Sequence, residues 1–173
     1  MKMKKAEAPQ METKNLILRK RMEADLPNMV KMFNTDDVTK YLGGYPPRDE
    51  HSWLKIIRHR NDHEWAVILK ETGEYIGECL LPKIVDKYLG KIGYVFMKEY
   101  WGNGYAQEAV SKIIEYCSDV LKLKRLYTTI DNKNIRSKKF IEKIGFEYIA
   151  LLPESDFGGR VADVVYYTKK LKV

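Results

Sequence analysis

Residues 100–109 read Tyr100-Trp101-Gly102-Asn103-Gly104-Tyr105-Ala106-Gln107-Glu108-Ala109, and this stretch decides the fold. It follows the apolar run 92–97 and opens a long segment whose apolar residues recur at helical spacing. The pattern predicts a strand that turns through glycines into a helix. Such a turn leaves backbone N–H groups without partners around a space the size of an anion, for which phosphate is the obvious candidate.

The glycine turn alone is weak evidence for a ligand. It matches neither the dinucleotide-binding pattern G-x-G-x-x-G nor the Walker pattern, because no third glycine and no Gly-Lys-Ser/Thr follows Gly104. A plain helix start explains it equally well, so the rest of the chain has to decide.

Length and composition predict one soluble globular domain. The chain has 173 residues, of which 45% are hydrophobic and 32% charged, so it is too apolar to be disordered and too charged to cross a membrane. We expect residues 1–12 to be a loose tail without a signal peptide, and 13–173 to be the domain. Cys79 and Cys117 lie in apolar segments, which favours buried thiols in a reducing cytoplasm over a disulfide.

The formal charge of +7 allows three explanations, which are nucleic acid binding, an anionic ligand and a solubilising surface. The basic residues that cluster within one short helical stretch are Lys133, Arg136, Lys138, Lys139 and Lys143. A local cluster of this kind fits a polyphosphate at least as well as a duplex, so we expect no nucleic acid partner. The three histidines lack acidic or cysteine partners at ligand spacing, so no metal is expected either.

The first half of the chain predicts a strand at 15–19 and a helix from Leu26 to Phe33 with Asp25 as its cap. A loop over 38–47 and a second helix from about Asp49 follow. The next three predicted strands are 64–69, 75–81 and 91–97. They should form an antiparallel meander, with Gly73 at positive φ in the first turn.

The second half alternates strands and helices. Apolar residues at helical spacing run from Ala106 to Leu121, and a short helix from Asn134 ends at Gly145 as its C-cap. The strands predicted here are 125–130, 146–152 and 161–171, the last two joined through Pro153 and Gly158-Gly159. We therefore predict an α/β (α+β) fold, with a mixed, mostly antiparallel sheet of six or seven strands and helices on both faces.

A second motif, Asn134-x-x-Ser137 followed by Glu142-Lys143-x-Gly145-Phe146, is ordinary helix capping when taken alone. Together with Ile92-Gly93-Tyr94 and the glycine turn, in this order, it resembles the GNAT superfamily of acetyl-CoA-dependent N-acetyltransferases. Within that superfamily the chain is most similar to the RimJ/RimL type, which acetylates the N-termini of ribosomal proteins. The likeness covers nearly the whole chain from Thr13.

This resemblance implies a binding site for acetyl-CoA. The backbone of Phe96 and Met97, at a splay after the central strand, would pair with the pantetheine arm. The pyrophosphate would lie on amides of the glycine turn, and Asn134 and Ser137 would hold the arm from the other side, with the Lys138 and Lys139 region offsetting the phosphate charge. The cofactor residues implied by the turn are Trp101, Gly102, Asn103, Gly104, Tyr105, Ala106 and Gln107.

The groups that would move protons are where the chain departs from its relatives. Many superfamily members have a tyrosine acid where this chain has Ile141, and many RimJ/RimL relatives have an acid where it has Lys91. We therefore consider Ser137 as the proton donor to the thiolate, and Glu78 or Glu99 as the base for the amine. A backbone N–H near Val95 or Phe96 would stabilise the oxyanion.

The acceptor is the least defined part of the prediction. Relatives bind it between the loop after the first helix and the closing strands, where this chain has its aromatic candidates Tyr41, Tyr45, Tyr94 and Phe157. The predicted acceptor is a primary amine, either a protein N-terminus or a small amine such as a polyamine, an amino acid or an aminoglycoside. A catalytically silent CoA-binding module is the other alternative, and the sequence leaves open whether the protein is a monomer or a homodimer.

Overall fold

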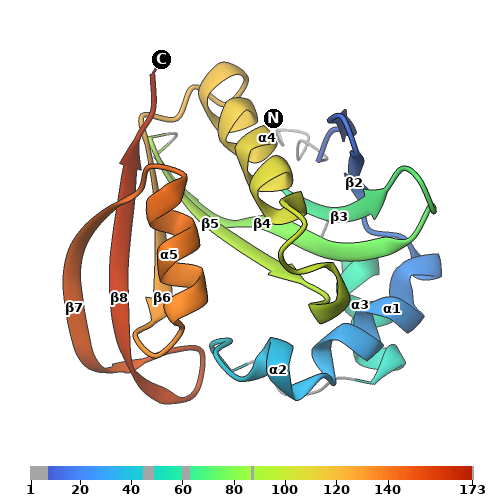
Figure 1. Ribbon diagram of the computed structural model, residues 1–173, viewed down its shortest axis with the longest axis horizontal. Helices are drawn as coiled ribbons and strands as arrows, with labels where there is room; N and C mark the ends of the chain where they lie inside the picture. Colours follow the sequence, from blue (N-terminus) through green and yellow to red (C-terminus); the bar gives the residue numbers. More distant parts are fainter. Residues whose placement is uncertain (1–7, 45–48, 60–62, 87, 173) are drawn as a thin grey trace, which may run out of the picture.

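The computed structural model describes residues 8–44, 49–59, 63–86 and 88–172 (Figure 1). The strands are β1 Met11–Glu12, β2 Leu16–Lys20, β3 Glu64–Leu69, β4 Tyr75–Val85, β5 Leu89–Phe96, β6 Arg125–Asp131, β7 Glu147–Asp156 and β8 Val161–Lys170. The α-helices are α1 Leu26–Phe33, α2 Asp36–Thr39, α3 Glu50–His59, α4 Tyr105–Asp119 and α5 Ile135–Lys143, and short 3-10 helices lie at Glu23–Asp25 and Lys98–Tyr100.

All eight strands belong to one sheet with the order β1-β2-β3-β4-β5-β6-β8-β7. Every neighbouring pair is antiparallel except β5 and β6, which are parallel. The predicted mixed, mostly antiparallel sheet is therefore confirmed, as is the meander of β3, β4 and β5. The strand beyond the seven predicted ones is β1, which has only two residues.

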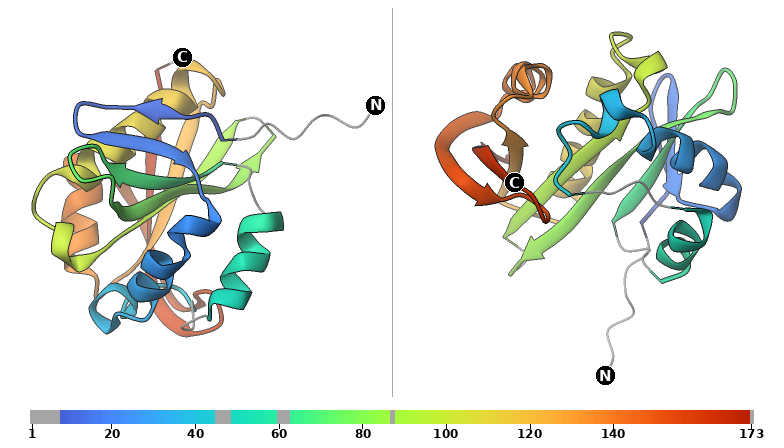
Figure 2. Two further views of the ribbon diagram at one scale, coloured as in Figure 1. Left: turned by 90° about the vertical axis from the view of Figure 1, so that its right-hand side faces the viewer. Right: turned by 90° about the horizontal axis from the view of Figure 1, so that it is seen from below.

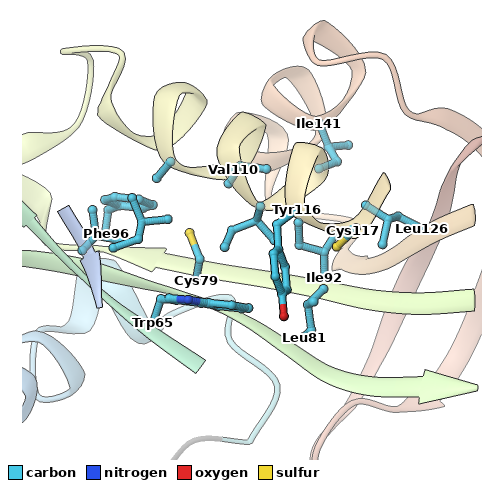
Figure 3. Close-up of a cluster of buried hydrophobic side chains, with 14 of the residues drawn as sticks. Trp65, Cys79, Leu81, Ile92, Phe96, Val110, Tyr116, Cys117, Leu126 and Ile141 are labelled. Atoms are coloured by element: carbon cyan, nitrogen blue, oxygen red, sulfur yellow. The ribbon is translucent and has the colours of Figure 1, made fainter. Parts of the chain in front are cut away.

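Helices cover both faces of the sheet, because its strands alternate apolar residues between two cores. Leu16, Leu18 and Trp65 face the core under α4 and α5, whereas Ile17 and Ala66 face the core under α1 and α3. Figure 2 shows the two helical layers on opposite sides, and Figure 3 shows Ile141 of α5 among the apolar side chains beneath α4.

The loose tail predicted over residues 1–12 is wrong for residues 8–12. Met11 and Glu12 pair with Leu18 and Ile17 of β2, and Ala8 is buried. The indole Nε1 of Trp65 donates a hydrogen bond to the carbonyl of Pro9 at 2.8 Å. A buried indole N–H needs an acceptor, and this contact ties the segment to the sheet. Residues 1–7 lie outside the described ranges.

The predicted capping role of Asp25 is also wrong. Its carboxylate does not cap α1 but accepts a bidentate pair of hydrogen bonds from Arg19, each 2.8 Å long, and a third from the backbone N–H of Met22. The carboxylate therefore fixes the turn between β2 and α1, because a bidentate arginine pair is stronger than a neutral cap.

The cysteines and the helices bear on two further expectations from the sequence. Cys79 and Cys117 are both free and buried, and burial raises the pKa of the Cys117 thiol to about 12. Across the described ranges, no helix combines the length and the apolar composition that a membrane span requires.

Candidate active site

The site is built around a gap between the parallel strands β5 and β6. They pair only at their first positions, Leu89 with Arg125, Gly90 with Leu126 and Lys91 with Tyr127. Beyond Lys91 the strands diverge, as Figure 1 shows, so that β5 from Ile92 to Phe96 has no strand partner on this side. The family resemblance implies a splay at Phe96 and Met97, and the structure shows that the strands already diverge after Lys91. The divergence exposes strand backbone inside the fold.

The register between β4 and β5 tells which backbone groups face the gap. The N–H of Met97 donates to the carbonyl of Ile76 at 2.9 Å, so the pair Gly77–Phe96 is a non-hydrogen-bonded pair of the antiparallel ladder. The N–H and C=O groups of Phe96 and, two residues earlier, of Tyr94 therefore point away from β4 and toward the gap. Phe96 keeps its predicted position, but Met97 is engaged by β4 and Tyr94 takes its place as a candidate.

The glycine turn presents a row of free amides. Gly102 and Gly104 have φ of 85° and 82°, a backbone conformation that favours glycine, and Gly104 is the N-cap of α4 without any side-chain cap. Among the described residues, no acceptor is bonded to the amides of residues 102–107. No atom lies within 4 Å of where a Cβ on either glycine would stand, so the turn is open to a ligand. Six free N–H groups at the start of a long helix make an anion site.

The start of α5 meets this turn across the gap. The side-chain Oδ1 of Asn134 accepts from the N–H of Ser137 at 3.0 Å, which confirms the predicted cap. The guanidinium of Arg136 lies 4.3 Å from the centre of the Trp101 ring, a cation–π contact that joins the two motifs. Lys139 is exposed, whereas the Nζ of Lys138 is bonded to Asn132. Positive charge therefore lies beside the free amides.

Two hydroxyl groups meet on the α5 side of the gap. The Oη of Tyr94 and the Oγ of Ser137 lie 2.6 Å apart, and the Tyr94 ring packs edge-on against Phe140 at 5.0 Å. Burial raises the pKa of the Tyr94 hydroxyl, so it stays protonated and can donate. Tyr94 was predicted to contact the acceptor amine, but the structure places its hydroxyl against Ser137, the candidate proton donor. Ile141, at the position of the tyrosine acid in many relatives, is fully buried in the core.

The two predicted bases lie in different surroundings. Glu78 is buried on the face under α1 and α3, where its carboxylate binds Arg21 at 2.9 Å and accepts from Tyr75 at 3.2 Å. Glu99 is exposed, and its carboxylate pairs with Lys31 at 2.7 Å, which lowers its pKa. Neither carboxylate touches Tyr94, Ser137 or the glycine turn in the contacts of the described residues.

The two loops predicted to hold the acceptor do meet. A Cβ on Gly43 would lie 2.9 Å from the carbonyl of Phe157, and the Nε of Arg160 donates to the carbonyl of Leu42 at 3.1 Å. Tyr41 directly precedes Leu42, and the Nζ of Lys40 lies 5.3 Å from the centre of its ring. Tyr45 lies outside the described residues. The cleft between the loops is open and about 800 Å³ in volume, and its charged lining residues are Asp36, Asp37, Lys40 and Arg160.

Comparison with known proteins agrees with this geometry. A family profile described as an acetyltransferase (GNAT) domain matches residues 15–147. The chain belongs to the GNAT acetyltransferase family. It is 31% identical over 166 residues to the uncharacterized N-acetyltransferase p20 of Bacillus licheniformis, covering 90% of this chain and 93% of that protein. This GNAT acetyltransferase is therefore an acyltransferase, and it has the fold that its sequence predicted.

Solved structures share the fold of this GNAT acetyltransferase. The spermidine N-acetyltransferase of Vibrio cholerae, in complex with CoA and spermine, superimposes with a TM-score of 0.80 at 20% identity and covers 91% of this chain and 96% of that one. RimL, a ribosomal L7/L12 alpha-N-protein acetyltransferase in complex with coenzyme A, gives 0.80 at 15% identity, with 94% and 98% covered. At these identities the likeness concerns the fold, and it includes proteins that act on very different amines.

Sequence reasoning missed two arginines of this GNAT acetyltransferase. Arg136 was seen only as one of a basic cluster, although its spacing from Ser137 puts it on the exposed first turn of α5. Arg160 was not singled out, yet its guanidinium binds the buried carboxylate of Asp131 and lies 5.3 Å from the Phe157 ring centre. The available signal was that Arg160 directly follows Gly158-Gly159. Its partners Asp131 and Leu42 are 29 and 118 positions away in the chain, so the sequence did not show them.

Asn134 allows a test of the site that separates folding from binding. Asn134→Ala should lower the free energy of unfolding by about 1 kcal/mol, because the cap of α5 is lost, and should weaken CoA binding. Asn134→Asp keeps the capping oxygen but replaces the amide NH2 by a charged oxygen, so it should retain stability and still weaken CoA binding. Denaturant unfolding and calorimetry measure the two effects. Unchanged CoA affinity in both variants would contradict the position assigned to Asn134.

Proposed function

We propose that this protein transfers an acetyl group from acetyl-CoA to a primary amine, of which a protein N-terminal amine is the leading candidate. The observation that carries the proposal is the combination of six free amides at the glycine turn with the backbone of Tyr94 and Phe96, which lacks a strand partner in the adjacent gap. The Phe96 carbonyl accepts from the indole Nε1 of Trp101 at 2.9 Å. The amides fit a pyrophosphate, and the exposed strand edge fits an extended arm with amide groups, as in β-strand addition. Both features belong to CoA.

Acetyl-CoA would supply the thioester that the amine attacks. On the protein side, the amides of residues 102–107 hold the diphosphate, with Arg136 and Lys139 offsetting its charge. The N–H groups of Tyr94 and Phe96 orient the arm, and the one nearer the carbonyl stabilises the negative charge that develops on its oxygen. Ser137 gives a proton to the leaving sulfur, and Tyr94 keeps the Ser137 hydroxyl in place through their 2.6 Å contact.

The amine side requires less of the protein if the acceptor is an N-terminus. An α-amino group has a pKa of ~7.7 to 8.0, whereas a lysine-type amine has ~10.4, so at pH 7 roughly a tenth of an N-terminus is unprotonated, against less than ~0.1% of a lysine-type amine. This fits a site in which Glu78 is held by Arg21 and Glu99 by Lys31. We therefore propose a reaction without a carboxylate base. We expect activity to rise with pH as the acceptor amine loses its proton.

The lining of the acceptor cleft does not favour polycations. An acidic cleft would attract polyamines and aminoglycosides, but here the acids Asp36 and Asp37 lie beside Lys40, and the fourth charged lining residue, Arg160, is paired with Asp131. Asp37 is further neutralised by its ion pair with Lys98. Charge at this cleft therefore gives a polyamine no advantage over a peptide.

A thiol-release assay tests the proposal. Purified protein is mixed with acetyl-CoA and, separately, with peptides, spermidine, amino acids and an aminoglycoside, and free CoA is measured. We expect release with at least one primary amine and a calorimetric response to CoA alone. Binding of CoA without release across the whole panel would favour the catalytically silent module, and no response to CoA would refute the proposal.

A further inference from the structure

A row of side chains crosses the face of the sheet opposite α4 and α5. Lys83 of β4 pairs with Lys91 of β5, Lys91 pairs with Tyr127 of β6, and Tyr127 pairs with Thr168 of β8. Side chains of directly paired residues share one face, so these four lie side by side. Ile92 and Leu126, the next residues on β5 and β6, belong to the core under α4 and α5, which puts Lys91 and Tyr127 on the other face.

This face is open where the row crosses it. Helices α1 and α3 cover the half of the sheet that contains Ala66, Ile68 and Tyr75, and the row does not belong to that core. Lys91 and Tyr127 are half-buried and Lys83 is exposed. The ring of Tyr166 stacks on that of Tyr127 with centres 5.2 Å apart and planes 15° apart, which forms a flat aromatic wall beside the ammonium groups.

The two lysines lack a protein counter-ion. No ion pair or hydrogen bond joins the Nζ of Lys83 or Lys91 to any residue that the structure describes. Like charges directly opposite each other in a sheet are destabilising. Burial, together with Lys83, lowers the pKa of Lys91. A pair kept in this arrangement would be relieved by an anion bound between the two ammonium groups.

The other charged groups on this face do not cancel the pair. Arg125 adds a third cation, and its Nη1 contacts the Thr168 hydroxyl at 3.4 Å. Asp131, at the far end of β6, is bound by Arg160. Glu64 and Glu78, on the same face under α1 and α3, are bound by Arg21. Glu147 lies opposite Thr168 on the edge strand β7, and β8 separates that strand from β6. The face is therefore positive around Lys91.

We propose that Lys83, Lys91 and the stacked rings of Tyr127 and Tyr166 form a subsite for an anionic group of the acceptor, so that the enzyme selects primary amines that also carry a carboxylate or phosphate. The subsite rests on the proposed acetyl transfer and specifies its substrate class. Lys91 is the last paired residue before β5 and β6 diverge, so the row lies at the closed end of the gap, on the face of the sheet opposite the hydroxyls of Tyr94 and Ser137. An acceptor held there approaches the gap from this opposite face. The ammonium pair attracts an anion and repels a polyamine, and the aromatic wall can stack on a planar ring that carries the anion.

A charge series of acceptors tests this subsite. The compounds 4-(aminomethyl)benzoate, 4-(aminomethyl)benzamide and 4-(aminomethyl)benzylamine share a ring and a primary amine and differ in the charge of the second group. We expect kcat/KM to be about tenfold higher for the benzoate than for the amide, a difference of ~1.4 kcal/mol. The diamine should be the poorest acceptor. Two peptides with glutamate or glutamine after the N-terminal residue distinguish a protein terminus from a small molecule.

Lys91→Gln and Lys83→Gln should bring the benzoate-to-amide ratio close to one, whereas Lys112→Gln should leave it unchanged. Lys112 pairs with Glu115 on α4, on the opposite face of the sheet. A wild-type protein that uses the amide or the diamine as well as the benzoate would overturn the subsite. So would a ratio that survives both substitutions.

A binding measurement keeps the subsite separate from the proposed function. If no amine releases CoA, acetyl transfer fails, and the subsite is then judged by calorimetry with 4-methylbenzoate, which has no amine. We expect this anion to bind the CoA-saturated wild type and to bind about tenfold more weakly to Lys91→Gln. Absence of binding to the wild type would overturn the subsite whatever the outcome of the transfer assay.

Discussion

Ser137→Ala should lower kcat by about 10²-fold, because it removes the group that we place as proton donor to the departing sulfur. CoA binding should change little. The backbone N–H of residue 137 donates to the side chain of Asn134, and this hydrogen bond persists when the side chain becomes alanine. Steady-state thiol release gives kcat, and calorimetry gives the affinity for CoA. The alanine also keeps the start of α5 capped, so the unfolding free energy should stay close to that of the wild type.

Two further variants test whether the fall in kcat comes from the Ser137 hydroxyl. Tyr94→Phe removes only the hydroxyl that contacts Ser137, and we expect a smaller fall in kcat, about tenfold, with the pH profile of kcat altered because the donor hydroxyl is no longer held. Ser118→Ala, on the far part of α4 where the hydroxyl bonds the carbonyl of Lys172, should leave kcat unchanged. Wild-type kcat in Ser137→Ala would remove this residue from the mechanism.

Local sequence patterns predicted the parts of the site that are local in the chain. Gly102 and Gly104 adopt positive φ, Asn134 caps α5, and Gly145 ends it with φ of 86°. Each of these depends on a few neighbouring residues, so the sequence around it is sufficient. The strand predicted at 15–19 is also local, and in β2 Leu16 and Leu18 face one core while Ile17 faces the other, because a strand has a period of two.

Contacts between distant residues could not be derived in the same way. The hydroxyl pair of Tyr94 and Ser137 spans 43 positions, and it joins α5 to β5 in the part of the strand that is no longer paired with β6. The engagement of Met97 by Ile76 follows from the register of β4 and β5, which a sequence pattern leaves undetermined by one residue. Glu78 illustrates the same limit, since nothing adjacent in the chain shows that Arg21 binds it.

Arg21→Ala should be among the most destabilising single substitutions, lowering the free energy of unfolding by roughly 3–5 kcal/mol. Its guanidinium is buried and binds Glu64 at 2.5 Å and Glu78 at 2.9 Å, so its removal leaves two carboxylates without their cation. Arg58→Ala is the matched control, because Arg58 forms an exposed ion pair with Glu23, and such a pair contributes about 0–1 kcal/mol. Denaturant unfolding of both variants at one pH measures the difference.

The loss in Arg21→Ala should also depend on pH. Burial raises the pKa of the Glu78 carboxyl, and Arg21 offsets part of that rise. A carboxyl whose folded pKa is raised contributes stability that is fully present below the pKa of the unfolded chain, ~4.3, and is lost as the pH rises through the folded value. Without Arg21 the folded pKa rises further, so ionising Glu78 costs more. The destabilisation should therefore be smallest near the unfolded pKa and grow toward neutral pH, and a loss independent of pH would show that Glu78 is not the group left uncompensated.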